Sequence, residues 1–144
     1  MEKEEYFVYE TLFASDELTG IPSGDVTLEP LTKPEQADLN LWGGTERELI
    51  EDFNQRNNGE YRLKRFDMGD GPRIIIRGVN DESDSTFSSG RTWVSRVGFK
   101  DDMTRAMVYV QHVATPESGI AYFVLLANEK YGWEIIGSSV AKIF

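Results

Sequence analysis

The spacing of hydrophobic residues changes along the chain, from three or four in the N-terminal part to two after residue 60. Over residues 4–13, apolar side chains recur every three or four positions behind a group of acids, which predicts a first helix. A second helix is expected over residues 46–56. Thr45 and Glu48 have the spacing of a capping box, and Asn57 opens an Asn-Asn-Gly sequence typical of a helix end.

Between these two helices, residues 25–28 form a short β-prone sequence, Asp-Val-Thr-Leu. Pro30 and Pro34 follow it closely. Because proline cannot donate a hydrogen bond to a neighbouring strand, we expect an extended segment at an edge of a sheet.

From Tyr61 onward, alternating β-branched and aromatic residues predict a series of strands. The expected strands cover residues 61–66, 73–79, 92–99, 105–113, 119–127 and 133–140. The last four are joined by short polar links, so they should form an antiparallel meander, because parallel pairing would require long crossovers. Residues 80–90 are rich in Ser and Asp without periodicity, which predicts a mobile loop.

Helices followed by strands are typical of the α+β class. The sequence predicts a single domain in which two N-terminal helices pack on one side of a curved, mainly antiparallel sheet with a C-terminal meander. A chain of 144 residues has the length of one ordinary domain, and its 40% hydrophobic content is sufficient for a core.

Composition excludes several classes of site. The chain has no cysteine and one histidine, so it cannot form a disulfide, a thiolate metal site or a multi-histidine metal site by itself. The acidic loop 80–91 also lacks the Gly and Glu positions of an EF-hand, and no G-x-S-x-G sequence is present. We therefore predict no metal and no cofactor.

The net charge of −10 argues against nucleic acid as a partner, since phosphate binding requires a clustered cationic surface. Residues 1–60 carry 15 Asp and Glu against 4 Lys and Arg, so all of the excess acid lies there. No apolar run is long enough to span a membrane, and residues 1–5 do not resemble a signal peptide. The chain as written is expected to be soluble. A leader peptide that had been removed from the natural protein would leave the same sequence, so its compartment is not decided by these residues.

His112 is the first candidate for proton transfer because its ordinary pKa lies near neutrality. By alternation along its strand it shares a face with Val108 and Val110, opposite Tyr109. A structural histidine is the favoured interpretation. The alternative is an acid/base site composed of His112, Tyr109 and Tyr122.

A cationic cluster is predicted on two neighbouring strands. Arg62 shares a face with Lys64, and Arg73 shares one with Arg77. These side chains are candidate ligands for an anion, although an intramolecular role beside the acidic N-terminal region, or a merely solvated face, is the favoured interpretation. Arg65, in the same predicted strand as Arg62 and Lys64, also belongs to this cationic cluster.

Three strand sequences carry a resemblance: SRVGF at residues 95–99, AMVYV at 106–110, and GIAYFVLLANEKYGWE at 119–134. They resemble an uncharacterised bacterial domain family in which such strands form consecutive hairpins. Residues 6–9 resemble the opening helix of that family, and residues 51–57 resemble its second helix. The resemblance implies this fold and a protein often exported behind a leader, but it implies no activity and no catalytic residue.

These observations favour a non-catalytic binding or interaction module that acts outside the cytoplasm on an unknown small molecule or protein. The alternative function is a small pocket enzyme on a cone-shaped scaffold similar to nuclear transport factors. Convergence of His112, Tyr109 and Tyr122 in one dry cavity would distinguish the enzyme from the module.

Overall fold

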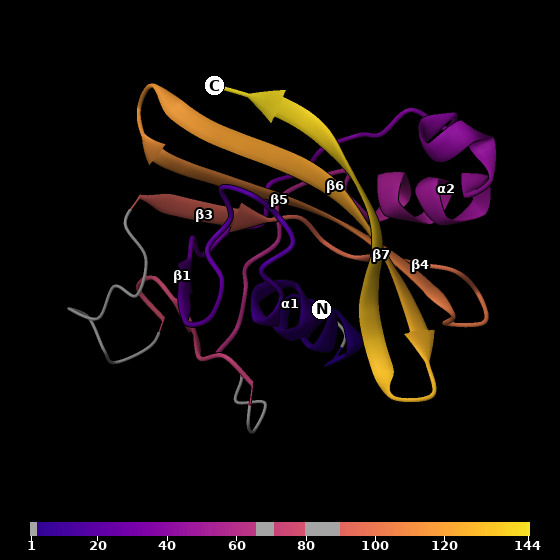
Figure 1. Ribbon diagram of the computed structural model, residues 1–144, viewed down its shortest axis with the longest axis horizontal. Coiled ribbons are helices and arrows are strands. Elements are labelled where there is room, and N and C mark those ends of the chain that lie inside the picture. The colour runs from indigo at the N-terminus through magenta and orange to yellow at the C-terminus, as the bar shows by residue number, and fades with distance from the viewer. Residues whose placement is uncertain (1–2, 66–70, 80–89) are drawn as a thin grey trace.

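The computed structural model describes residues 3–65, 71–79 and 90–144 (Figure 1). Its elements in chain order are α1 (Lys3–Ala14), β1 (Val26–Leu28), η1 (Leu41–Gly44), α2 (Arg47–Arg56), β2 (Ile74–Ile76), β3 (Arg91–Val94), β4 (Gly98–Phe99), β5 (Arg105–Thr115), β6 (Ser118–Glu129) and β7 (Gly132–Ile143). Both predicted helices are present within one residue of their expected bounds. The predicted loop over residues 80–90 falls almost entirely outside the described residues.

The strands form one open, mixed sheet in the order β2-β1-β3-β5-β6-β7, with β4 also paired to β5. The predicted meander is confirmed, because β3, β5, β6 and β7 pair antiparallel with their neighbours in turn. The α+β class is confirmed with it. Parallel pairing is nevertheless present, since β1 is parallel to both β2 and β3.

Strand β1 lies inside the sheet, so the prediction of an edge segment is wrong. All three of its residues are buried, and the three isoleucines of β2 beside it are buried too. Parallel strands are usually covered on both faces, which agrees with this burial. The prolines limit the length of β1 without preventing pairing on either side, because they lie after the strand.

Helices α1 and α2 lie against opposite faces of the sheet, so their predicted packing on one side is wrong (Figure 1). Val108 and Val110 of β5 belong to the hydrophobic cluster that contains the apolar side of α1. Met107 and Tyr109, between them in the sequence, belong to the cluster that contains Leu49, Ile50 and Phe53 of α2. The sheet therefore has an α1 face and an α2 face, both apolar.

One predicted strand, residues 92–99, is divided into β3 and β4, which pair with successive parts of β5. We call the interruption between them, residues 95–97, the seam. There the Arg96 guanidinium donates to both oxygens of Glu5 from α1, at 3.1 and 2.8 Å. The Arg96 backbone also exchanges hydrogen bonds with the Asn57 side chain after α2. The seam thus fastens both helices to the sheet.

Two local predictions fail at η1 and after α2. Thr45 makes no capping box, because its hydroxyl donates to the Trp42 carbonyl of η1 and Glu46 precedes the helix instead. Residues 61–65 form no strand apart from an isolated bridge between Arg62 and Leu31. The strand predicted over residues 73–79 is shortened to β2.

Candidate functional site

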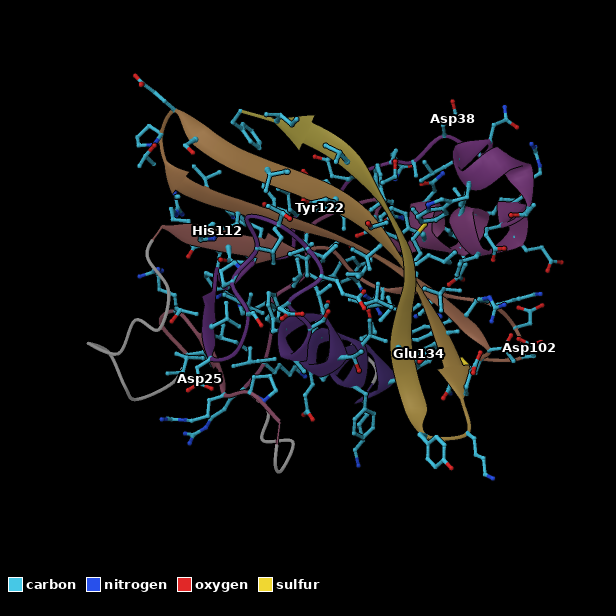
Figure 2. The ribbon with its side chains drawn as sticks, in the orientation of Figure 1. Asp25, Asp38, Asp102, His112, Tyr122 and Glu134 are labelled. Atoms are coloured by element: carbon cyan, nitrogen blue, oxygen red, sulfur yellow. The ribbon has the colours of Figure 1, made fainter. Side chains whose placement is uncertain are left out.

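His112 lies on the α1 face near the end of β5 (Figure 2). Only 7% of the residue is exposed, and Nδ1 lies 2.8 Å from the Thr92 hydroxyl of β3. Burial lowers the pKa of its imidazole, so the neutral form is favoured. This environment supports a structural histidine.

The other two acid/base candidates do not gather around His112 in one site. Tyr109 is fully buried on the α2 face, where its hydroxyl donates to Gln111 Oε1 at 2.6 Å. Burial, reinforced by the nearby Glu35 carboxylate, raises the pKa of that phenol. Tyr122 lies on the α1 face and donates to the Thr19 carbonyl at 2.7 Å (Figure 2). The sheet therefore separates Tyr109 from His112, as the alternation along β5 predicted.

The four cationic candidates are distributed rather than gathered. Arg77 donates to Glu29 at 2.8 Å, and Glu29 also accepts from Arg91. Arg73 lies at the other end of β2, where its backbone N–H donates to Asp25. Pairing of Arg77 with an acid of the N-terminal region was predicted, whereas the participation of Arg91 was not. Arg91 is the first residue of β3, and this position places its side chain beside Glu29.

The remaining two candidates, Arg62 and Lys64, lie on the irregular segment after α2 and are exposed. Arg62 takes part in the bridge to Leu31, and the Lys64 backbone N–H donates to the Tyr6 hydroxyl at 3.1 Å. The common strand face predicted for them does not form. The structure thus offers no shared anion site built from the four predicted cations.

A groove that the sequence did not predict lies between α1 and the β6–β7 hairpin. It consists of two hollows, of about 360 and 350 Å³, that share Glu10, Thr11 and Trp133. Helix α1 supplies one wall, and β7 with the turn before it supplies the other (Figures 1 and 2). We call this feature the α1–β7 groove.

Three carboxylates and three aromatic rings line the α1–β7 groove. The acids are Glu4, Glu10 and Glu17, and the aromatic residues are Phe7, Tyr131 and Trp133. Among the described residues that line it, none is basic. Two lysines lie beside it, with Lys3 Nζ 5.7 Å from the Phe7 ring centroid and Lys130 Nζ 5.8 Å from the Tyr131 ring centroid. The carboxylates outnumber these two ammonium groups, so the groove favours cations over anions.

Trp133 is the anchor of the groove. Its indole N–H donates to Glu4 Oε2 at 2.9 Å, and its ring packs against Phe99 with centroids 5.8 Å apart. These two contacts fix the ring between α1 and the sheet while part of it remains exposed. A fixed indole beside carboxylates is a suitable surface for an alkylammonium or guanidinium group.

The sequence contained one usable signal for the groove. Glu4, Phe7, Thr11 and Ala14 recur along one side of α1 at three- or four-residue spacing, which places them in a single row. The apolar stripe that predicted the helix lies on its other side. Which strand would face this row could not be read from the spacing.

Comparison with known proteins gives no match among protein-family models, curated proteins or solved structures. The resemblance to an uncharacterised bacterial family therefore stays a prediction. Within the described part of the chain, no helix has the length and apolar character needed to cross a membrane. Over residues 3–65, 71–79 and 90–144, no group of three or more His, Asp or Glu side chains is arranged to hold a metal ion.

Proposed function

We propose that this protein is a non-catalytic binding module whose α1–β7 groove takes a cationic group from a small molecule or from a basic segment of a partner protein. One observation carries the proposal: Trp133 and three carboxylates line a continuous groove, and these acids outnumber the two lysines, Lys3 and Lys130, that lie over its other aromatic rings. Carboxylates supply charge attraction, and the indole supplies a face for the cation.

The composition supports the same direction. A chain with a net charge of −10 attracts cations at long range and repels polyanions. The excess acid is concentrated in residues 1–60, which include α1. The general field and the local groove therefore favour the same class of ligand.

The enzyme alternative has no comparable support. Its three candidate residues are divided between the two faces of the sheet, with Tyr109 on one and His112 and Tyr122 on the other. Each also has a hydrogen-bond partner within the protein. Proton transfer to a shared substrate would require these groups to converge.

A titration followed by NMR tests the binding proposal. The probe is the acetylated and amidated peptide Lys-Lys-Lys, added to the uniformly ¹⁵N-labelled protein. We expect the largest shifts at the Trp133 indole N–H and at amides of α1 and β7. A Glu-Glu-Glu peptide should leave these signals unchanged.

Matched variants separate a groove from a general charge effect. Glu4→Gln/Glu17→Gln removes two carboxylates from the groove, whereas Glu48→Gln/Glu51→Gln removes two exposed carboxylates from α2. We expect the first pair to weaken binding about tenfold and the second to weaken it less than about twofold. Equal weakening by both pairs, or shifts spread over the whole surface, would contradict the proposal.

We also propose, from the resemblance of the C-terminal strands, that the natural protein is bacterial and acts outside the cytoplasm. Fractionation of the cells that produce it, followed by immunoblotting, tests the location. Recovery in the periplasmic or extracellular fraction is expected. Recovery with cytoplasmic markers would contradict the proposed location without affecting the groove.

A further inference from the structure

Strand β7 is a long edge of the sheet. It pairs with β6 on one side and ends the strand order, so among the described residues no strand lies on its other side (Figure 1). It contains 12 residues, whereas β2 at the opposite edge contains three. A long edge exposes backbone N–H and C=O groups that can pair with another chain.

The exposed side chains of this edge are unusually apolar. Ile136 is 45% exposed and Val140 is 51% exposed, and Ile143 after them is 77% exposed. Edges that avoid pairing commonly carry several lysines, a proline or β-bulges. The sequence of β7 contains one lysine, Lys142, and no proline, while its pairing with β6 shifts register at two places.

We propose that β7 pairs antiparallel with β7 of a second copy of this chain, around a two-fold axis at Ser138. This register places the only two charged residues of β7, Glu134 and Lys142, opposite each other in both directions. It also places Ile136 opposite Val140, two exposed apolar residues, on either side of the axis. A two-fold interface requires such self-complementarity.

The faces of the two charged residues agree with this register. Directly opposed residues in an antiparallel pair project to the same face of a sheet. Glu134 and Lys142 are paired with Ala127 and Ala121 of β6, and two irregularities of register lie between them. These alanines are six residues apart on β6, so Glu134 and Lys142 project to one face.

Lys142 already forms an ion pair with Glu35 at 2.6 Å, and 46% of its side chain remains exposed. An ammonium group has three donors, so it can donate to a second carboxylate beside the first. In the dimer it would lie between Glu35 of its own chain and Glu134 of the second copy. The contact complements the existing pair without replacing it.

Cysteine cross-linking tests the register, because the natural sequence contains no cysteine. Ser138 meets its own counterpart at the axis, where opposed Cα atoms lie within the range that a disulfide spans. Ser138→Cys should therefore become a disulfide-linked dimer under mild oxidation. Ser139→Cys, which meets Gly137 in this register, and Ser118→Cys, at the exposed first residue of β6, are the controls.

We expect Ser138→Cys to cross-link at least about tenfold faster than either control, because only its sulfurs are held together. Thiol labelling of the unfolded proteins confirms that all three cysteines are reduced before oxidation. Equal rates for the three variants, or faster cross-linking of Ser139→Cys, would overturn this register.

Charge exchange tests the pair itself by sedimentation velocity at physiological ionic strength, where repulsion between the acidic chains is screened. Glu134→Lys and Lys142→Glu should each weaken dimerisation about tenfold, and the double exchange should restore most of it. Melting temperatures show whether the monomers remain folded. A wild-type chain that stays monomeric up to millimolar concentration would overturn the dimer. Peptide binding in the α1–β7 groove is measured separately, so either proposal can fail alone.

Discussion

Helix α1 presents carboxylates to two different environments. Glu5 is fully buried at the seam, where both of its oxygens accept from Arg96 and one also accepts from the Val97 backbone N–H. Glu4, the residue before it, faces the α1–β7 groove and accepts from the neutral indole of Trp133. Neighbouring residues of the same charge thus have different surroundings.

The difference shows that burial and the identity of the partner decide what a carboxylate does here. A buried ion is tolerated only when hydrogen bonds and an opposite charge surround it, and the seam supplies both. A partly exposed carboxylate needs no such enclosure. The exposed Glu17 of the α1–β7 groove can therefore attract a ligand from solvent, while Glu5 holds the helix to the sheet.

Removal of Glu5 is the strongest test of this comparison. Glu5→Ala should lower the free energy of unfolding by about 3–5 kcal/mol, because it leaves the Arg96 charge and a buried N–H without their partner. Glu4→Ala, the matched control in the same turn, should cost about 1 kcal/mol for one hydrogen bond. Urea denaturation at pH 7 measures both. Equal losses would show that the seam is no more important to stability than the groove.

The contact of α2 with β4, next to the seam, should have a smaller effect. A methyl group on Gly98 would lie 2.6 Å from Phe53 Cα and 2.7 Å from Phe53 N, so the backbone of α2 would have to move. Gly98→Ala should therefore cost about 1–3 kcal/mol.

The control for Gly98 is Gly59, where no heavy atom lies within 4 Å of an added methyl group. Gly59→Ala should change stability by about 0.5 kcal/mol or less. Thermal and urea denaturation compare the two variants with the wild type. A Gly98→Ala variant as stable as the wild type would mean that α2 does not pack closely against the sheet at this point. The contrast between the seam and the α1–β7 groove would then depend on α1 alone.

Local patterns predicted the elements that depend on local chemistry. The bounds of α1 and α2 follow from hydrophobic spacing, and the order of β5, β6 and β7 follows from their short links. The opposite orientation of His112 and Tyr109 follows from the alternation of a strand. In each case the determining residues lie close together in the sequence.

Features that depend on distant segments were not predicted. Whether β1 would lie at an edge was decided by β2 and β3, which flank it from much later in the chain. The packing of the helices on opposite faces had a signal in residues 106–110, which are buried without interruption. An unbroken apolar run favours cover on both faces, whereas one covered face would leave alternate residues polar.

The α1–β7 groove and η1 also depend on contacts that local sequence patterns do not predict. The row that contains Glu4 and Phe7 was visible in the sequence, but its facing wall comes from the distant β7. Thr45 failed as a helix cap because η1 brings the Trp42 carbonyl within reach of its hydroxyl. Trp42 has a left-handed backbone, with φ of 56°, that no local propensity favours.

The smallest expected effect distinguishes the neutral polar pair at Thr92 and His112 from the charged seam. Burial lowers the pKa of His112 in the folded protein, while the unfolded chain keeps the ordinary value of 6.5. Below about pH 6.5 the unfolded chain therefore binds more protons, and the stability due to neutral His112 is present above that pH and lost as the pH falls through the folded pKa.

His112→Gln removes this titration. Its destabilisation, about 1 kcal/mol at pH 8, should shrink at pH 5.5. Because Glu5→Ala retains the only histidine, its pH dependence should follow that of the wild type. Urea midpoints at the two pH values measure both differences. A destabilisation by His112→Gln that stays constant would show that folding does not shift the pKa of His112, and one that grows at pH 5.5 would show that folding favours the charged histidine.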